Sequence, residues 1–347
     1  MAIIDKPSDY FNTKLYTGNA TDDTVITGVG FQPDFVWFKE RSSTSGHVQL
    51  DSVRGGSKFL QSNSSNAEGT STDLIKSFDS DGYTIGTNNA INDNTVTMAS
   101  WNWLASNTTA SNTDGSITST VSANTTSGFS IVSYTGTGSN ATIGHGLGAT
   151  SQVVLIKELN GTNNWLMSHQ PLSASLGDYT RFITLNSTSA VSGPGNVVFQ
   201  GSAFTSSVFN VGTSAGSNGS GQNYIAYCFA DVQGYSKFGI YTGNGNADGT
   251  FVYTGFKPAF VIIKRTDTTA FWRLYDNKRN TFNIVDKRIA PNDSGAETTA
   301  DDLDFLSNGF KQRGTSGANN ASGGSYIYMA FAENPFVTST SIPCTAR

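Results

Sequence analysis

The chain repeats one sequence pattern three times, at intervals of roughly one hundred residues. Each copy has a Tyr-Thr-Gly tripeptide, followed by an apolar run that ends in lysine. The tripeptides begin at Tyr16, Tyr134 and Tyr241, and the lysines are Lys39, Lys157 and Lys264. This interval is too long for the unit of a solenoid and suits a small domain. The pattern therefore predicts three copies of one domain in a single chain.

Other positions keep the same register between the copies. Twelve residues after the lysines stand Asp51, His169 and Asp276. Each copy closes on an aromatic strand, whose last aromatic residues are Trp103, Phe229 and Phe331. Most of the positions that stay in step are apolar or aromatic, which is typical of a shared hydrophobic core.

Short β-branched and aromatic runs, separated by Asp-Gly and Asn-Gly turns, indicate strands and not helices. We expect an all-β chain with three tandem β-sandwich domains of jelly-roll or concanavalin-like type. The predicted boundaries are 1–106 for repeat 1, 129–233 for repeat 2 and 234–347 for repeat 3, which ends in an extended tail. The polar segment 107–128 is a linker, or else a strand laid along a neighbour.

The joins between the repeats differ in character. Tyr235 and Phe238 give the short join between repeats 2 and 3 apolar anchors, so we expect these two repeats to be packed rigidly and repeat 1 to be freer. Three similar domains in one chain also suggest an arrangement around a pseudo-threefold axis. This is a hypothesis that a structure can test.

Composition argues against several classes of function. Charged residues make up 14% of the chain, whereas about 25% is usual. The net charge of −5 offers no basic stripe for nucleic acid. We find no apolar segment of membrane-spanning length and no secretory signal. Cys228 and Cys344 do not recur between repeats, so both are interpreted as free thiols, and no spacing typical of metal ligands or of a cofactor site is present.

The lysine and the residue twelve positions later form the clearest polar pair. It consists of Lys39 with Asp51, Lys157 with His169, and Lys264 with Asp276. One interpretation is a structural ion pair between neighbouring strands, and the other is part of a polar pocket. Glycoside hydrolysis requires two carboxylates, and no acidic pair recurs in all three copies. We therefore expect no catalytic residues and no enzymatic activity.

Aromatic side chains are the candidates for ligand binding, because exposed rings stack on sugars. Trp165 and Trp272 both lie eight residues after the lysine, and His47 takes that position in repeat 1. These three are the candidate ligand-binding residues. The alternative for them, and for Trp37, is a place in the core.

Three strings resemble a repeat module of virion proteins from marine cyanobacterial and related bacteriophages. They lie at 16–37, 77–83 and 326–336, and the resemblance covers nearly the whole chain. It implies a phage structural protein in a tail fibre or appendage, where it contributes to attachment to host-surface glycans. The implied location is the virion, and the implied partners are other virion proteins, host polysaccharide and further copies of this chain. A capsid decoration protein is the first alternative, and a glycan depolymerase is the second.

Overall fold

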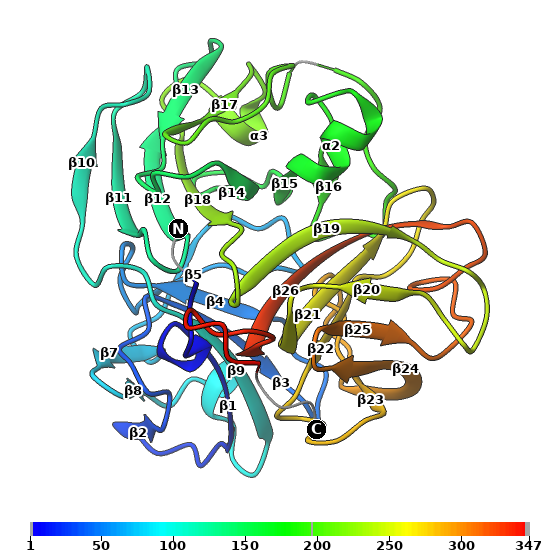
Figure 1. Cartoon of the computed structure of the whole chain (residues 1–347). Coiled ribbons are helices and arrows are strands. Elements are labelled where there is room, and N and C mark those ends of the chain that lie inside the picture. The colour runs from blue at the N-terminus through cyan, green and yellow to red at the C-terminus, as the bar shows by residue number, and fades with distance from the viewer. Residues whose placement is uncertain (1–2, 196, 344–347) are drawn as a thin grey trace.

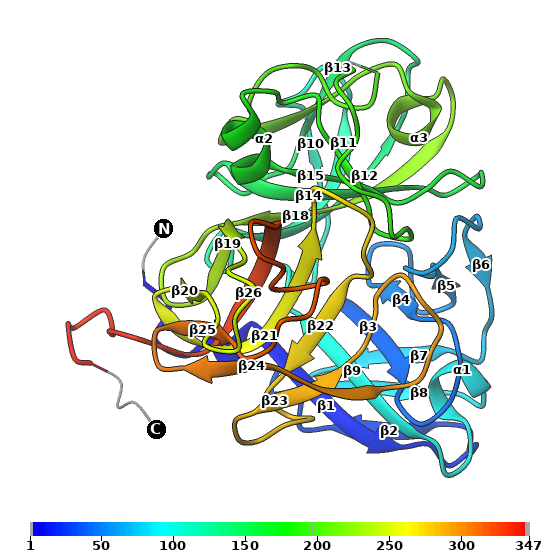
Figure 2. The same ribbon diagram turned by 90° about the vertical axis from the view of Figure 1, so that its right-hand side faces the viewer.

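The computed structural model describes residues 3–195 and 197–343. It is nearly all-β, with 42% of residues in strands and 5% in helices, and its sheets are antiparallel. The all-β prediction is therefore confirmed. Figures 1 and 2 show three lobes around a common centre, one lobe for each repeat.

The repeats share an arrangement of inner strands and differ in their other elements. The elements of repeat 1 are η1 (Pro7–Asp9), β1 (Phe11–Thr17), β2 (Thr24–Thr27), β3 (Phe35–Glu40), β4 (Val48–Asp51), β5 (Lys58–Phe59), β6 (Gly69–Thr70), β7 (Ile75–Asp79), β8 (Gly82–Ile85), α1 (Asn89–Asn92) and β9 (Thr97–Trp103). Those of repeat 2 and the segment before it are β10 (Ala110–Asn112), β11 (Ser119–Asn124), β12 (Phe129–Thr135), β13 (Ala141–Gly144), β14 (Ser151–Glu158), β15 (Leu166–His169), α2 (Gln170–Leu176), β16 (Ile183–Thr184), β17 (Val208–Val211), α3 (Ala215–Asn218) and β18 (Asn223–Ala230). Those of repeat 3 are β19 (Ser236–Thr242), β20 (Phe251–Tyr253), β21 (Phe256–Arg265), β22 (Arg273–Asp276), β23 (Val285–Arg288), β24 (Thr298–Leu306), β25 (Gly309–Gln312) and β26 (Ser325–Pro335).

An inner sheet with one strand order occurs in every repeat. The order is β1-β9-β3-β4 in repeat 1 and β19-β26-β21-β22 in repeat 3. Repeat 2 contains the matching order β12-β18-β14-β15 within a seven-stranded sheet. An outer sheet of three, two or four strands accompanies each inner one, in the orders β2-β8-β7, β13-β17 and β20-β25-β24-β23. The last strand of each repeat thus pairs between its first and third strands.

Both faces of the inner sheets are buried. Between the inner and outer sheet of each repeat lies a core of its own. The opposite faces of the three inner sheets share one further core, to which all repeats contribute. This explains why Phe35–Phe38 and Val261–Ile263 are continuous apolar runs, since alternate side chains enter different cores.

The expectation that repeat 1 is freer than the others is wrong. Phe11 and Trp103 of repeat 1 contact Phe260 and Phe331 of repeat 3, with ring centroids 5.3–5.7 Å apart. Phe35 of repeat 1 stacks on Tyr227 of repeat 2, with centroids 4.3 Å apart. Repeat 1 is therefore packed against both of its neighbours.

The polar segment 107–128 is not a free linker. Its strands β10 and β11 extend the inner sheet of repeat 2, and β11 pairs with β12 from Thr120–Ser133 to Asn124–Phe129. Of the two sequence-based alternatives, the strand laid along a neighbour is confirmed. The predicted extended tail also differs, because the described part folds back with a bridge between Val337 and Pro343.

Candidate functional site

The three candidate ligand-binding residues lie inside the molecule. Trp165 and Trp272 are completely buried, as is His47, so the expectation of an exposed stacking surface is wrong. Each ring instead bonds to a backbone carbonyl of the neighbouring repeat. Trp165 Nε1 donates to Gln61 O (2.9 Å) and Trp272 Nε1 donates to Thr184 O (3.2 Å).

His47 makes the third contact of this kind. Its Nδ1 accepts a hydrogen bond from Trp37 Nε1 (2.9 Å), so the proton is on Nε2 and is donated to Ala290 O (3.0 Å). Burial lowers the pKa of His47 to about 3 and keeps the ring neutral. The three rings thus join repeat 2 to repeat 1, repeat 3 to repeat 2, and repeat 1 to repeat 3, which is a closed cycle.

The predicted ion pair between lysine and aspartate does not form. Asp51 pairs with Arg54 (2.6 Å) and Asp276 pairs with Arg279 (2.5 Å), each three residues further along the chain. Within each pair the carboxylate also accepts a hydrogen bond from the backbone N–H of the arginine (2.8 Å). The acid therefore holds the turn that follows the fourth strand of the repeat.

Each of these carboxylates also reaches the next repeat. Asp51 accepts from Tyr227 Oη of repeat 2 (2.8 Å), and Asp276 accepts from Trp101 Nε1 of repeat 1 (3.0 Å). Tyr227 and Trp101 occupy the same position in their closing strands, two residues before the last aromatic residue. The two ion pairs are thus buried contacts between repeats.

His169 of repeat 2 also holds the turn that follows its strand and also bonds to the next repeat, but it does so without a charge. Its Nδ1 accepts from the backbone N–H of Leu172 (3.3 Å), which places the proton on Nε2, where it is donated to Tyr328 O of repeat 3 (3.3 Å). Burial lowers the pKa of His169 to about 4. Leu172 stands where the other repeats have Arg54 and Arg279, so no cation faces the imidazole there.

The three lysines are buried at the ends of the central strands. Each ammonium donates to two backbone carbonyls. Lys39 bonds Glu40 O and Ser43 O, Lys157 bonds Glu158 O and Gly161 O, and Lys264 bonds Thr188 O and Ala270 O, over 2.7–3.4 Å. Burial lowers the pKa of each to about 8. Since Thr188 belongs to repeat 2, Lys264 also ties two repeats together.

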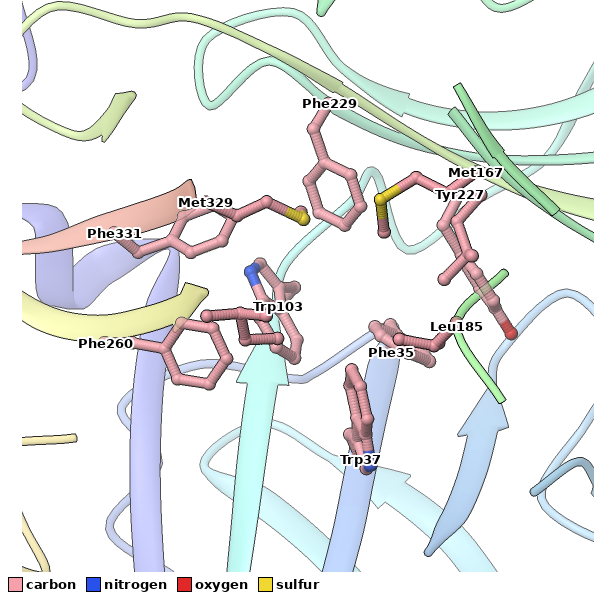
Figure 3. A pocket seen from close by; sticks show the side chains of 12 residues that line it. Phe35, Trp37, Trp103, Met167, Leu185, Tyr227, Phe229, Phe260, Met329 and Phe331 are labelled. Carbon is pink, nitrogen blue, oxygen red and sulfur yellow. The ribbon is translucent and has the colours of Figure 1, made fainter. Parts of the chain in front are cut away.

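A small apolar cavity of about 20 Å³ lies where the inner sheets meet (Figure 3). The last aromatic residues of the three repeats surround it. Ring centroids are 6.4 Å apart for Trp103 and Phe229, 5.6 Å for Trp103 and Phe331, and 5.8 Å for Phe229 and Phe331. Trp37 also lines it, which confirms its interpretation as a core residue. An apolar cavity this small offers no polar partner to a ligand.

The two arginines were not among the residues predicted from the sequence to form a site. Arg54 and Arg279 follow the acid by three residues in the two repeats that keep it, and Leu172 appears where the acid becomes histidine. This joint change of two positions was visible in the sequence, and it indicates that the acid pairs with the arginine and not with the lysine.

Catalytic chemistry finds little support within residues 3–195 and 197–343. No group of three or more His, Cys, Asp or Glu side chains there could hold a metal ion. In the same part of the chain, no helix combines the length and apolar character needed to cross a membrane. Cys228 is a buried free thiol, as predicted, and burial raises its pKa. Cys344 lies outside the described residues.

Comparison with known proteins identifies a family. No curated protein matches the chain. A family model described as a domain of unknown function, DUF7483, matches residues 6–335 as a single unit. That match includes all three inner sheets and the contacts that close them into a cycle. The chain therefore belongs to the DUF7483 family.

Proposed function

We propose that this chain is a non-catalytic structural subunit of a bacteriophage virion, carried on a tail fibre or appendage, where it contributes to attachment to the host surface. We further propose that its three repeats are homologous β-sandwich domains arranged around a pseudo-threefold axis. The resemblance of the strings at 16–37, 77–83 and 326–336 to phage virion modules supports the first statement. The recurring strand order supports the second.

One observation carries the proposal. Polar and aromatic side chains occur at equivalent positions of the repeats, and a catalytic set would be sought among them. These side chains instead form hydrogen bonds between the repeats. Their burial leaves them no access to a substrate. A rigid body with variable loops suits display and attachment, because loops on a fixed scaffold carry recognition.

Immunogold labelling of intact virions tests this proposal. Antibody raised against the purified chain is applied to virions of the phage that encodes it, with antibody pre-absorbed on the chain as the control. Gold on the tail or its appendages supports the proposal. Gold spread over the head supports the decoration alternative and contradicts attachment, and virions without gold contradict a virion role altogether.

A glycan depolymerase makes a different prediction for the same purified chain. Incubation with capsular or cell-wall polysaccharide of the host would release reducing ends if the chain were a hydrolase. We expect no release above that of heat-unfolded chain. A release that increases with time and with protein concentration would overturn the non-catalytic assignment.

A further inference from the structure

Repeat 1 has a buried aspartate before its third strand that accepts hydrogen bonds from neighbouring groups, and repeat 3 has no such side chain at the equivalent position. Asp34 in repeat 1 accepts hydrogen bonds from Ser52 Oγ (2.5 Å) and from the backbone N–H of Ala105 (2.7 Å). One backbone hydrogen bond beside it is the same in repeat 3, where Asn277 N donates to Ala259 O (2.9 Å) just as Ser52 N donates to Asp34 O (2.8 Å). The position of Asp34, however, is taken by Ala259.

Polar atoms near Ala259 have no hydrogen-bond partner in the protein. Asn277 Oδ1 is buried and accepts no hydrogen bond, and the same holds for Thr13 Oγ1 of repeat 1. Asn277 and Thr13 both line an inner cavity of about 80 Å³ between repeats 1 and 3. Buried polar groups normally have partners, because an unpaired group costs about 1–3 kcal/mol. This cavity is polar and large enough for water or for a hydroxymethyl group.

A larger surface cleft of about 430 Å³ shares Asn277 and Glu333 with the inner cavity. It lies along the connection between β22 and β23 and the start of β21, and its volume is within the range of small-molecule sites. Lys257 and Glu333 form an ion pair in it (2.8 Å), so the charges at this wall balance. Both side chains are about one third exposed, at 28% and 34%.

Phe282 stands at this cleft with 84% of its surface exposed, more than any other large apolar side chain among the described residues. An aromatic ring on the surface loses the free energy of burial, which is about 1.5–3 kcal/mol for such a side chain. A ligand with an apolar face would cover it. The cleft thus combines one exposed ring, an amide with a free acceptor, and a neutralised pair of charges.

We propose that this cleft binds a neutral hexopyranose unit of a host-surface polysaccharide. The C–H face of the sugar stacks on Phe282, a ring hydroxyl bonds the Lys257–Glu333 pair, and the hydroxymethyl group reaches Asn277 Oδ1 in the inner cavity. Hydroxyl groups fit because each donates and accepts, whereas the cleft presents an unpaired acceptor beside a cation. The biological source of the sugar rests on the proposed function, but the chemistry of the cleft does not.

The test is binding of free sugars to the whole purified chain. The probes are methyl glycosides of glucose, galactose, mannose and N-acetylglucosamine, with glucuronic acid as the charged comparison, and the readout is saturation-transfer NMR. We expect at least one neutral sugar to bind with a Kd on the order of 1 mM, as suits a single sugar unit. Phe282→Ala should weaken this binding by about tenfold, a factor that corresponds to about 1.4 kcal/mol.

Two further variants make the test specific. Ala259→Asn places an amide where repeat 1 has Asp34, fills the inner cavity and pairs Asn277, so it should weaken binding without lowering the melting temperature. Phe251→Ala is the control, because Phe251 is also exposed (44%) but does not line the cleft. It should bind as the unchanged chain does.

Several results would overturn the inference. They are the absence of binding by every neutral sugar, binding of glucuronic acid alone, or equal losses in Phe282→Ala and Phe251→Ala. These outcomes are separate from the immunogold result. Labelled virions without sugar binding leave the proposed function standing and remove only this site, and sugar binding without labelled virions does the reverse.

Discussion

The His169 contact between repeats 2 and 3 contains no ion pair, whereas the equivalent contacts of repeat 1 with its two neighbours each contain a buried one. Asp51 with Arg54, and Asp276 with Arg279, meet a hydrogen-bond donor from the next closing strand, Tyr227 or Trp101. At the third contact that closing strand carries Met329, which has no such donor.

Three changes accompany one another at this neutral contact. Aspartate becomes His169, arginine becomes Leu172, and the donor becomes Met329, with the hydrogen bond moved to the backbone at Tyr328 O (3.3 Å). A carboxylate left without its arginine and its donor would be a buried unpaired charge. At this position the fold requires a side chain that accepts a hydrogen bond from the following turn and forms another with the next repeat. A charged aspartate and a neutral histidine both meet this requirement.

The largest expected effect comes from breaking a charged contact on one side only. Arg279→Ala leaves Asp276 buried with an uncompensated charge, which should lower the free energy of unfolding by about 3–5 kcal/mol. Urea unfolding followed by tryptophan fluorescence measures it. Arg181→Ala is the matched control, because its pair with Asp178 is partly exposed and should contribute at most about 1 kcal/mol. Equal losses in the two variants would contradict the importance given to the buried pair.

Acid should weaken the neutral contact at His169. The folded-state pKa of His169 is about 4, below its ordinary value of 6.5, so the unfolded chain takes up the proton first as the pH falls. Its contribution to stability is complete above pH 6.5 and is lost down to about pH 4, with a total of up to about 3 kcal/mol.

The variant His169→Asn isolates this contribution, since asparagine can accept from Leu172 N–H but does not titrate. Unfolding measured at intervals between pH 7 and pH 4 should show a shallower loss of stability in the variant than in the unchanged chain. His47 titrates in both proteins and supplies the remaining slope. Identical slopes would mean that His169 is not neutral and buried in solution.

A conversion of the first charged contact to the neutral type sharpens the comparison further. Asp51→His alone places an imidazole against the Arg54 guanidinium and should destabilise the chain. Adding Arg54→Leu and Tyr227→Met should recover part of the loss, with a coupling of about 1–3 kcal/mol. A thermodynamic cycle of the single, double and triple variants measures the coupling. Additive losses would show that the three positions are independent.

The smallest effect is expected from removing one hydrogen bond while the ring is kept. Trp165→Phe and Trp272→Phe each leave a carbonyl of the neighbouring repeat, Gln61 O or Thr184 O, without its donor. Each should cost about 1–3 kcal/mol, part of it from the smaller ring. Thermal unfolding compares the two variants, and similar values would support their equivalence in the cycle.

Much of the architecture was predictable because it rests on patterns that a sequence displays. Short β-branched runs indicated strands, and the recurring lysines and closing aromatics lie on equivalent strands of the three inner sheets. The shared core was not predictable in this way. The apolar run Phe35–Phe38 predicts a strand that is buried on both faces. It does not show whether a helix, a loop or another repeat covers the second face of that strand.

The site predictions failed for a related reason. Trp165 and Trp272 occupy equivalent positions in their repeats, and so do Asp51 and Asp276. Such recurrence indicates that a position matters, but not whether its side chain is exposed. The side chain that decides their role lies in another repeat, more than one hundred residues away for Trp101 and Asp276. The cleft at Phe282 had no signal at all, because it arises where repeat 3 departs from the pattern.

The chain also carries its three interfaces on one polypeptide, and the segments near its two ends are tied into the ring, through Ile4 N to Gln233 O (3.1 Å) and Ser339 N to Asp5 Oδ1 (2.7 Å). Three separate subunits would meet only at sufficient concentration, and dilution would separate them. Three repeats in one polypeptide associate at any concentration, since each partner is held at a high effective concentration by its linker. Each interface can then diverge by itself, because a mutation in one repeat is not copied into the other two. This freedom allows one interface to replace its buried ion pair by a neutral histidine, and one repeat to carry a cleft that the others lack.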